Sequence, residues 1–314
     1  MKYTKPSDLK ILFLGTPHIA ARVLERILEA GYFVSALICQ EDKPQGRKGV
    51  LTPCEAKEMA LRHNIPVYSP HRIRKEHEFL KDIDYNIILC IAYGQIIPDD
   101  VLKSAPLGSY NLHGSLLPKY RGAAPMQRAL MDGEKETGVC LMEMVSEMDA
   151  GDVFDKKKFP IEENDNYSSI ERKMGEAASD LIVKDLLPLA NGELHPEKQN
   201  PALVTIAKKI LPEDEHLPLS LSLKQTHDYI SALSEKPGAY VYLEGKKLKI
   251  LSSERTSFAL KGDVGTLWRD RKHLYLNLKD GVLSLKTLQI EGKKAMDAVS
   301  FLNGHQNIDG MRLS

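Results

Sequence analysis

Three short apolar runs in the first hundred residues constrain the fold most strongly. Residues 11–14, 33–38 and 87–92 read ILFL, FVSALI and IILCIA. Continuous apolar runs of this length are typical of strands buried on both faces, as in a parallel sheet. Helix-like segments at about 17–30 and 53–63 separate them. This alternation predicts an α/β fold, with a doubly wound, mostly parallel sheet and helices on both faces.

The pattern changes after residue 190. An amphipathic helix from Tyr167 to about Leu187, with Pro188 as its stop, should close the first domain. Residues 191–207 are polar and contain proline, which is typical of a linker. Five short alternating segments follow, at 239–243, 248–251, 264–268, 274–278 and 282–290, and they predict a small β-barrel. We therefore predict a domain at 1–190, a linker at 191–207 and a C-terminal barrel at 208–314.

Composition limits the functional classes. The formal net charge is zero, so no global field attracts nucleic acid, but residues 207–314 carry 17 Lys and Arg against 13 Asp and Glu. That excess permits a polyanionic partner for the C-terminal part. Cys39, Cys54, Cys90 and Cys140 form no C-x-x-C pair, so we expect free thiols and no metal. No run is long enough for a signal peptide or a membrane span, which favours a cytoplasmic protein away from membranes.

The stretch NLHGSLLPKYRGAAP, residues 111–125, carries the most chemistry. Asn111 and His113 lie two residues apart at the end of a strand-like run, so their side chains should point to the same side. Ligands of open α/β sheets bind at the carboxyl ends of strands. Asp149, in the MDAGD segment after the next strand-like run, is the best candidate to orient the ring. We predict that these three residues form a catalytic set.

Each of these residues also has an ordinary structural role available to it. A histidine near a strand end is more often structural than catalytic, an asparagine before a turn usually bonds the backbone, and Asp149 before Gly151 makes a common turn. The joint occurrence of an amide, an imidazole and a carboxylate on successive strand ends favours a site. The G-x-G-x-x-G signature is absent after the first run, where only Gly15 is present, which argues against a nicotinamide cofactor.

Residues 40–52, QEDKPQGRKGVLT, predict a mobile loop longer than most connections in such folds. Lys43, Arg47 and Lys48 follow its last acidic residue, Asp42. The stretch is either a solvated turn or an arm that becomes ordered on an anionic partner.

Several motifs resemble those of the methionyl-tRNA formyltransferases, a branch of the folate-dependent formyltransferases. They are LGTP (14–17), AYGQIIP (92–98), NLHGSLLPKYRGAAP (111–125), TGV (137–139) and MDAGD (148–152). KPQGRKGVLTP (43–53) resembles the tRNA-contacting insertion of that family, and LQIEGKKAMDAVSFLNG (288–304) resembles the end of its barrel domain. Residues 217–219 and 230–232 read LPL and ISA, where the family usually has Ile-x-Trp and Ile-Arg-Ala, which leaves the tRNA contacts of that region open.

The resemblance implies transfer of a formyl group from 10-formyltetrahydrofolate to the α-amino group of methionine on initiator tRNA. It implies a Rossmann-like formyltransferase domain followed by an OB-like, tRNA-binding barrel, in a cytoplasmic monomer without a metal. By position, Asn111, His113 and Asp149 are catalytic. The residues expected at folate are Tyr93, Gly94, Ser115, Leu116, Leu117 and Pro118, and those expected at tRNA are Lys43, Arg47, Lys48, Lys293 and Lys294.

Three alternatives stay open at this point. The nearest is a formyltransferase that acts on an amino sugar nucleotide, because Gly114 stands where the methionyl-tRNA family more often has Ala and is shared with the sugar enzymes. A hydrolase of the same folate could use the same catalytic set. The third is a non-catalytic nucleic-acid binder in which Asn111 and His113 only cap a loop. The arginine-bearing loop and the EGKKAM segment, residues 291–296, favour tRNA.

Overall fold

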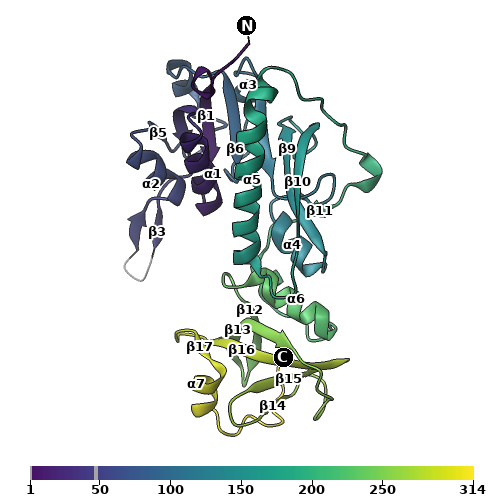
Figure 1. Ribbon diagram of the computed structural model, residues 1–314. Helices are drawn as coiled ribbons and strands as arrows, with labels where there is room; N and C mark the ends of the chain where they lie inside the picture. Colours follow the sequence, from purple (N-terminus) through teal and green to yellow (C-terminus); the bar gives the residue numbers. More distant parts are fainter. Residues whose placement is uncertain (1, 46–48) are drawn as a thin grey trace. The chain divides into compact units, whose positions relative to one another are not determined.

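The computed structural model describes residues 2–45 and 49–314 (Figure 1). The chain forms two compact units. The first, called the sheet unit, comprises Met1–Pro125, Glu136–Phe159 and Glu171–Ala207. The second, called the barrel unit, comprises Met126–Lys135, Pro160–Ile170 and Lys208–Ser314. Both units are therefore discontinuous in sequence, whereas the domain boundaries at 190 and 208 stay a prediction.

Strands and helices alternate up to Ala207. The strands are β1 (Lys10–Gly15), β2 (Phe33–Ile38), β3 (Lys43–Gln45), β4 (Val50–Thr52), β5 (Val67–Tyr68), β6 (Ile87–Ile91), β7 (Ser109–His113), β8 (Arg121–Gly122), β9 (Glu136–Glu143), β10 (Val153–Pro160) and β11 (Ile206–Ala207). The helices are α1 (His18–Glu29), α2 (Glu55–Arg62), α3 (Asp99–Leu102), α4 (Pro125–Met131) and α5 (Tyr167–Ala190), with short 3-10 turns η1 (Pro6–Asp8), η2 (Glu78–Asp82) and η3 (Pro201–Leu203).

Seven strands form one sheet in the order β10-β9-β7-β6-β1-β2-β5. Five strands pair in parallel, in the order β7-β6-β1-β2-β5. Strand β9 pairs antiparallel with β7. The predicted mostly parallel α/β sheet is thus confirmed. The chain builds β2 and β5 on one side of β1 and then returns to place β6 on the other side. The strand order therefore reverses between β1 and β6, which is where open α/β sheets bind ligands.

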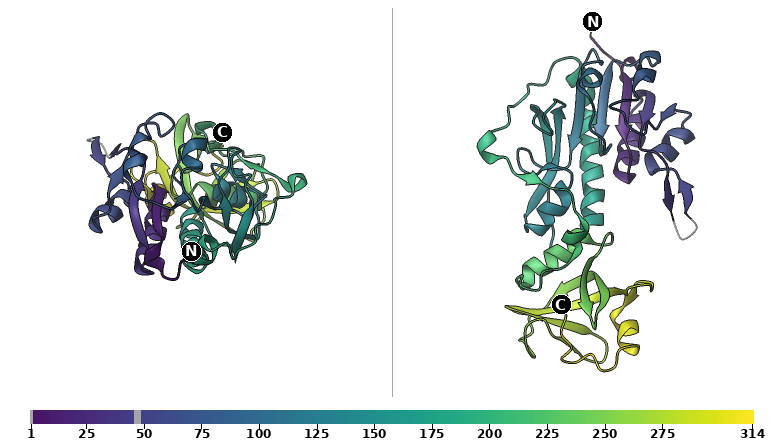
Figure 2. Two further views of the ribbon diagram at one scale, coloured as in Figure 1. Left: turned by 90° about the horizontal axis from the view of Figure 1, so that it is seen from above. Right: turned by 180° about the vertical axis from the view of Figure 1, so that it is seen from behind.

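The central strands are buried on both faces, as their apolar runs require. Leu12 and Leu14 of β1 belong to one core with Ile88 of β6 and with Val101 and Leu102 of α3. Helices α1 and α5 lie next to each other and run along the strands (Figures 1 and 2). Arg22 of α1 and Glu176 of α5 form an ion pair at 3.3 Å.

Three elements of the sheet unit differ from the expectations. The predicted mobile loop at 40–52 contains an antiparallel ribbon, in which Lys43 of β3 lies opposite Thr52 of β4; Arg47 and Lys48 lie outside the described residues. Pro188 lies inside α5 instead of stopping it, because a missing N–H this close to the helix end removes only one hydrogen bond of the last turn. Strand β10 was not expected, because only one of its residues is fully buried and its KKK run hides the apolar alternation.

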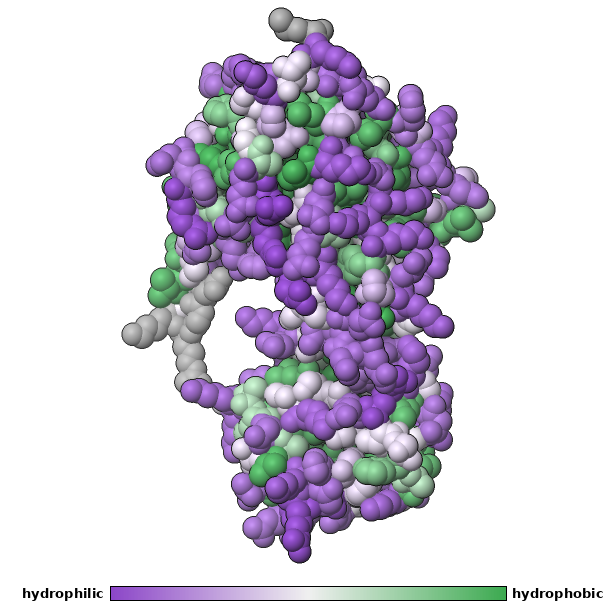
Figure 3. Space-filling model, viewed as in Figure 1, coloured by the Kyte–Doolittle hydropathy of each residue, from purple (hydrophilic) through white to green (hydrophobic). Residues whose placement is uncertain are grey.

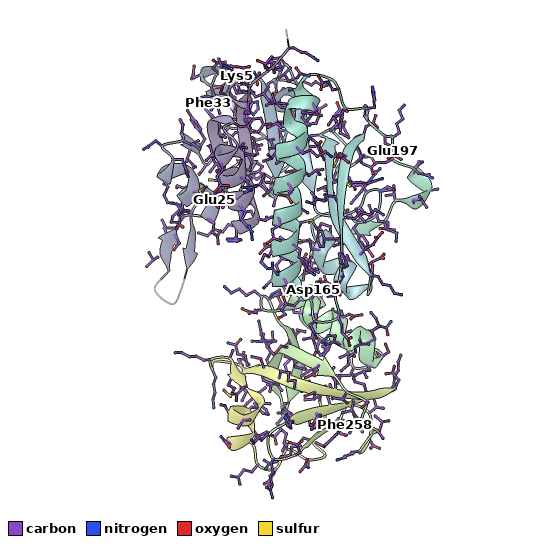
Figure 4. All side chains as sticks on the ribbon, in the orientation of Figure 1. Lys5, Glu25, Phe33, Asp165, Glu197 and Phe258 are labelled. Atoms are coloured by element: carbon purple, nitrogen blue, oxygen red, sulfur yellow. The ribbon has the colours of Figure 1, made fainter. Side chains whose placement is uncertain are left out.

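Residues 191–207, expected as a linker, pack within the sheet unit. Strand β11 pairs in parallel with β8. Glu197, labelled in Figure 4, exchanges two backbone hydrogen bonds with Val153 of β10, at 2.9 and 2.8 Å. The composition suggested a linker because the side chains of this segment are mostly exposed, while its backbone makes the contacts.

The barrel unit confirms the predicted antiparallel strands. Its elements after Ala207 are η4 (Pro212–Glu215), α6 (Leu223–Leu233), β12 (Ala239–Leu243), β13 (Lys246–Arg255), β14 (Leu267–Arg269), β15 (Leu274–Leu278), β16 (Gly281–Ile290), β17 (Met296–Asp297) and α7 (Ala298–Asn303). The strands pair in the order β12-β13-β16-β15-β14, with β17 on β16.

The last residues of the chain close this sheet into a barrel. Leu267 of β14 donates its backbone N–H to Met311, and Tyr242 of β12 exchanges backbone hydrogen bonds with Ser314. The C-terminal segment thus bridges the two edge strands, which removes the open edges of the sheet. Of the helices that the structure describes, none combines the length and the apolar character that crossing a membrane requires.

Candidate active site

His113 and Asp149 lie side by side at one end of the parallel strands. His113 is the last residue of β7, and its side chain is 6% exposed. Its Nδ1 lies 3.5 Å from Asp149 Oδ1, and its Nε2 donates to the carbonyl of Tyr120 at 2.9 Å, since a carbonyl can only accept. Asp149 Oδ2 accepts the backbone N–H of Gly122 at 2.8 Å. The carboxylate is therefore fixed beside the imidazole.

Asn111 lies two residues before His113 on the same strand. It is half-buried, opposite Cys90 of β6 and Met142 of β9. Because side chains alternate along a strand, the carboxamide points to the same face of the sheet as the imidazole. The sheet thus places an amide donor next to the histidine and aspartate pair.

Backbone strain is concentrated around this pair. Among the described non-glycine residues, five have a positive φ, and three of these are Ala92 at 47°, Tyr120 at 60° and Asp149 at 54°. Ala92 follows β6, and Tyr120 and Asp149 are the two neighbours of His113. Non-glycine residues in this region cost on the order of 1–3 kcal/mol each, less for Asp, and cluster at functional sites. The chain reversals that position these groups are therefore energetically costly.

Two residues of the 191–207 segment brace the pair, and sequence reasoning missed both. Gln199 accepts a hydrogen bond from Arg121 Nε at 3.0 Å and donates to the carbonyls of Asp149 and Gly151 at 2.8 and 2.7 Å. Thr205 Oγ1 accepts the backbone N–H of Tyr120 at 2.8 Å. No local pattern distinguishes a glutamine that bonds distant backbone from one that faces water, so the sequence carried no signal for these contacts.

The Gln199 contacts lead to a stability prediction. We expect Gln199→Ala to lower the free energy of unfolding by about 1–3 kcal/mol, because two carbonyls and one guanidinium N–H lose their partner, and to lower turnover through the displaced Asp149. Urea unfolding measures the first effect. Gln289→Ala is the matched control, because Gln289 makes one exposed hydrogen bond, to Lys293. Equal stability of the two variants would contradict the bracing role.

The residues expected at folate fall into two groups. Tyr93, Ser115 and Leu117 have buried side chains, and Ser115 Oγ donates to the carbonyl of Lys119 at 2.6 Å. Burial raises the pKa of the Tyr93 phenol, which therefore stays neutral. These three residues are therefore not part of the accessible surface. Gly94 is exposed, and Leu116 and Pro118 are half-buried, so this second group offers the accessible surface.

The residues expected at tRNA are far apart in the sequence. Lys43 is exposed on β3 in the sheet unit, and Lys293 and Lys294 are exposed between β16 and β17 in the barrel unit. Arg47 and Lys48 are outside the described residues. Of the described cations, Lys43 therefore belongs to the sheet unit, and Lys293 and Lys294 belong to the barrel unit.

The cysteines next to the pair are not nucleophiles. Burial raises the pKa of Cys90 to about 12 and that of Cys140, opposite His113 on β9, to about 11. Both thiols stay protonated near neutral pH, and a thiol attacks poorly. Within residues 2–45 and 49–314, no group of three or more His, Cys, Asp or Glu side chains is arranged to hold a metal ion.

Comparisons with known proteins agree with this geometry. Residues 9–186 match the family described as Formyl transferase, and residues 209–306 match Formyl transferase, C-terminal domain. The doubly wound sheet, its strand-end site and these matches define a formyltransferase. The chain is 40% identical over 301 residues to the methionyl-tRNA formyltransferase of Lactobacillus gasseri, covering 94% of this chain and 95% of that one, and 38% identical over 300 residues to that of Malacoplasma penetrans, covering 95% and 94%. The chain belongs to the methionyl-tRNA formyltransferase family.

A solved structure shows the same fold at lower identity. WlaRD, a sugar 3N-formyl transferase solved in the presence of dTDP and 5-N-formyl-THF, has a TM-score of 0.67 and 20% identity. The match covers 91% of this chain and 99% of that one. At this identity the likeness shows the fold and does not favour a sugar substrate.

Proposed function

We propose that this protein transfers a formyl group from 10-formyltetrahydrofolate to the α-amino group of methionine carried on initiator tRNA, for translation initiation. The observation that carries the proposal is the 40% identity to a methionyl-tRNA formyltransferase over nearly the whole length of both chains. The amino sugar nucleotide alternative rests on Gly114, because the sugar formyltransferases among the solved structures are at most 20% identical and share only the fold. We also propose that the enzyme works as a cytoplasmic monomer.

Attack of a neutral amine on the formyl carbon creates a negative oxygen and a positive nitrogen, and Asn111 stabilises the oxygen in this proposal. Its carboxamide N–H₂ is a donor on a rigid strand, between two hydrogen-bonded neighbours. A donor fixed before the reaction needs no reorganisation when the charge develops, and loss of one such donor costs roughly 3–4 kcal/mol in the barrier. Asn111 is thus the proposed oxyanion donor.

His113 manages the proton in the proposed mechanism. It either moves a proton from the attacking amine to the departing folate nitrogen or donates to the same oxygen as Asn111. Its Nε2 is bonded to the carbonyl of Tyr120, so the Nε2–H must leave that carbonyl before it can serve the substrate. Asp149, 3.5 Å from Nδ1, keeps the ring in place and stabilises an imidazolium. The substrate amine is the nucleophile, so no covalent enzyme intermediate is needed.

A product assay tests the proposal. The purified protein is incubated with 10-formyltetrahydrofolate and either methionylated initiator tRNA or an amino sugar nucleotide. We expect formyl-methionyl-tRNA and no formylated sugar. Formylation of the sugar alone would establish the alternative substrate, release of formate without any acceptor would indicate a hydrolase, and tRNA binding without turnover would indicate a non-catalytic binder.

Arg47 is proposed as the contact of the 40–52 segment with the acceptor end of tRNA. We expect Arg47→Ala to raise KM for tRNA about 10- to 100-fold, because a hydrogen bond between charged groups is worth about 1.5–3 kcal/mol. KM for the folate should not change. Steady-state kinetics with each substrate varied in turn measure both values, with Arg74→Ala as an exposed-arginine control. An unchanged KM for tRNA would remove Arg47 from tRNA binding.

A further inference from the structure

The outer face of the barrel unit carries an aromatic cluster that formyl transfer does not use. Trp268 of β14 lies directly opposite Tyr275 of β15, and their rings stack with centroids 4.1 Å apart at 21°. Leu267 and Leu276, their sequence neighbours, belong to the barrel core. Because side chains alternate along strands, Trp268 and Tyr275 are on the outside of the barrel. Both are nevertheless less than 9% exposed.

A segment without regular structure, residues 256–264, covers this face and leaves a pocket beside it. The pocket has a volume of about 260 Å³, and its lining includes Phe258, Leu260 and Lys261 of the segment together with Trp268, Asp270 and Tyr275. Phe258 is 49% exposed, and Figure 4 labels it on this unit. Figure 3 shows hydrophobic groups among hydrophilic ones on the surface of the barrel unit. The pocket is thus an aromatic site open to solvent.

A hydrogen bond fixes the Trp268 ring, and the Lys261 side chain covers part of one face of the ring. Its Nε1 donates to Asn277 Oδ1 at 3.2 Å, which fixes the ring. Lys261 Nζ lies 4.0 Å from the ring centroid. Tyr275 is equally close, so the two neighbours must occupy opposite faces. Since a lysine ammonium on a flexible stem moves easily, displacing Lys261 would uncover indole surface on that side without rearranging the barrel.

The stretch of sequence that forms the pocket carries more positive than negative charge. Residues 258–275 contain four Lys and Arg and two Asp. Asp263 pairs with Arg312, while Arg271 and Lys272 form no ion pair with any residue that the structure describes. Asp270 stays ionised: burial raises its pKa, but hydrogen bonds from the backbone of Lys272 and from the ring and backbone of His273 outweigh this and hold the pKa well below its usual range. Lys261 and Asp270 are thus the charged residues of the lining, and Arg271 and Lys272 follow Asp270 in the sequence.

We propose that this pocket binds one unpaired nucleobase of the RNA substrate, stacked on the Trp268 face that Lys261 now covers, with the Lys261 ammonium moved to the adjacent phosphate. An aromatic ring with neighbouring cations is the combination that single-stranded nucleic acid requires, because every base has a π-face. The Asp270 oxygens already accept hydrogen bonds from Lys272, His273 and Tyr275, so the base is held by stacking and by the phosphate contact and its identity is not read. The inference rests on the proposed tRNA substrate.

The single tryptophan of the chain makes the site observable. The full-length protein is titrated with the single-stranded oligoribonucleotide pentaadenylate while Trp268 fluorescence is recorded, and with inorganic polyphosphate of equal charge. We expect saturable quenching by pentaadenylate and none by polyphosphate. Equal quenching by both ligands would overturn the inference, because it would show that the ligand is bound by its charge alone. An unchanged signal with pentaadenylate would also overturn it, because it would show that no base stacks on Trp268.

Variants locate the binding. Phe258→Ala and Lys261→Met should each raise the dissociation constant of pentaadenylate about tenfold, whereas Phe33→Ala, 53% exposed on β2 in the sheet unit, should not. Because Lys261 is exposed, Lys261→Met should fold normally. Its dissociation constant therefore tests the proposal even if Phe258→Ala does not fold. An unchanged dissociation constant in Lys261→Met, with an unchanged melting temperature, would overturn the proposed contact.

Kinetics separate this inference from the proposed function. Lys261→Met should raise KM for methionylated initiator tRNA about tenfold and leave kcat unchanged. Formyl transfer by the unaltered protein together with an unchanged KM in the variant would overturn the pocket and leave the function intact. Quenching by pentaadenylate in a protein that transfers no formyl group to tRNA would keep a base-binding pocket and refute the proposed function.

Discussion

His113→Ala should lower kcat for formyl transfer about 10²- to 10⁴-fold, the usual contribution of a positioned acid or base. Affinity for tRNA should stay near normal, because the imidazole is almost fully buried and bonded within the sheet unit. Single-turnover rates at saturating substrates measure the effect. A variant that retains most of its turnover would refute the role of His113.

The structure provides a matched control for this loss. His77 also contacts a carboxylate, with its Nε2 2.9 Å from Asp100 Oδ2, and it lies in the same unit. We expect His77→Ala to keep full turnover. A similar loss in both variants would mean that removing any histidine and aspartate pair damages the sheet unit, and the kinetic effect at His113 would then be structural.

Asn111→Ala should lower kcat about 10²- to 10³-fold, the cost of one oxyanion donor. KM should change little, since the bond strengthens only as the charge develops. Asn111→Asp is the matched variant, because it keeps the size of the side chain and replaces the donor by an acceptor. We expect it to be at least as slow as Asn111→Ala. Substantial activity of Asn111→Asp would exclude the oxyanion role and leave only a packing role for this residue.

Part of the fold and of the site could be predicted from the sequence, because some contacts are local. Buried strands such as β2 (Phe33–Ile38) and β15 (Leu274–Leu278) were predicted at their observed bounds, since a short continuous or alternating apolar run bounded by turn residues is typical of a buried strand. The placement of Asn111 and His113 on one face follows from strand periodicity alone. The motifs also predicted the family to which the chain belongs, and the relatives confirm it.

The missed features depend on partners far apart in the sequence. Asp149 was predicted beside His113, but the contacts that hold it there, from Gly122 to its carboxylate and from Gln199 to its backbone, leave no local pattern. The same holds for β8 and β11, two-residue strands that exist only because they pair with each other. The pocket at Trp268 was hidden for a further reason: its lining comes from an irregular segment folded over two strands, which periodicity cannot indicate.

The most direct test of the central claim is a double-mutant cycle on His113 and Asp149. Single-turnover formylation of methionylated initiator tRNA is measured for the unaltered protein, His113→Ala, Asp149→Ala and the double variant. If Asp149 acts through the ring 3.5 Å away, the double variant should be no slower than His113→Ala alone. Losses that multiply would show that the two residues act independently and would contradict the proposed coupling.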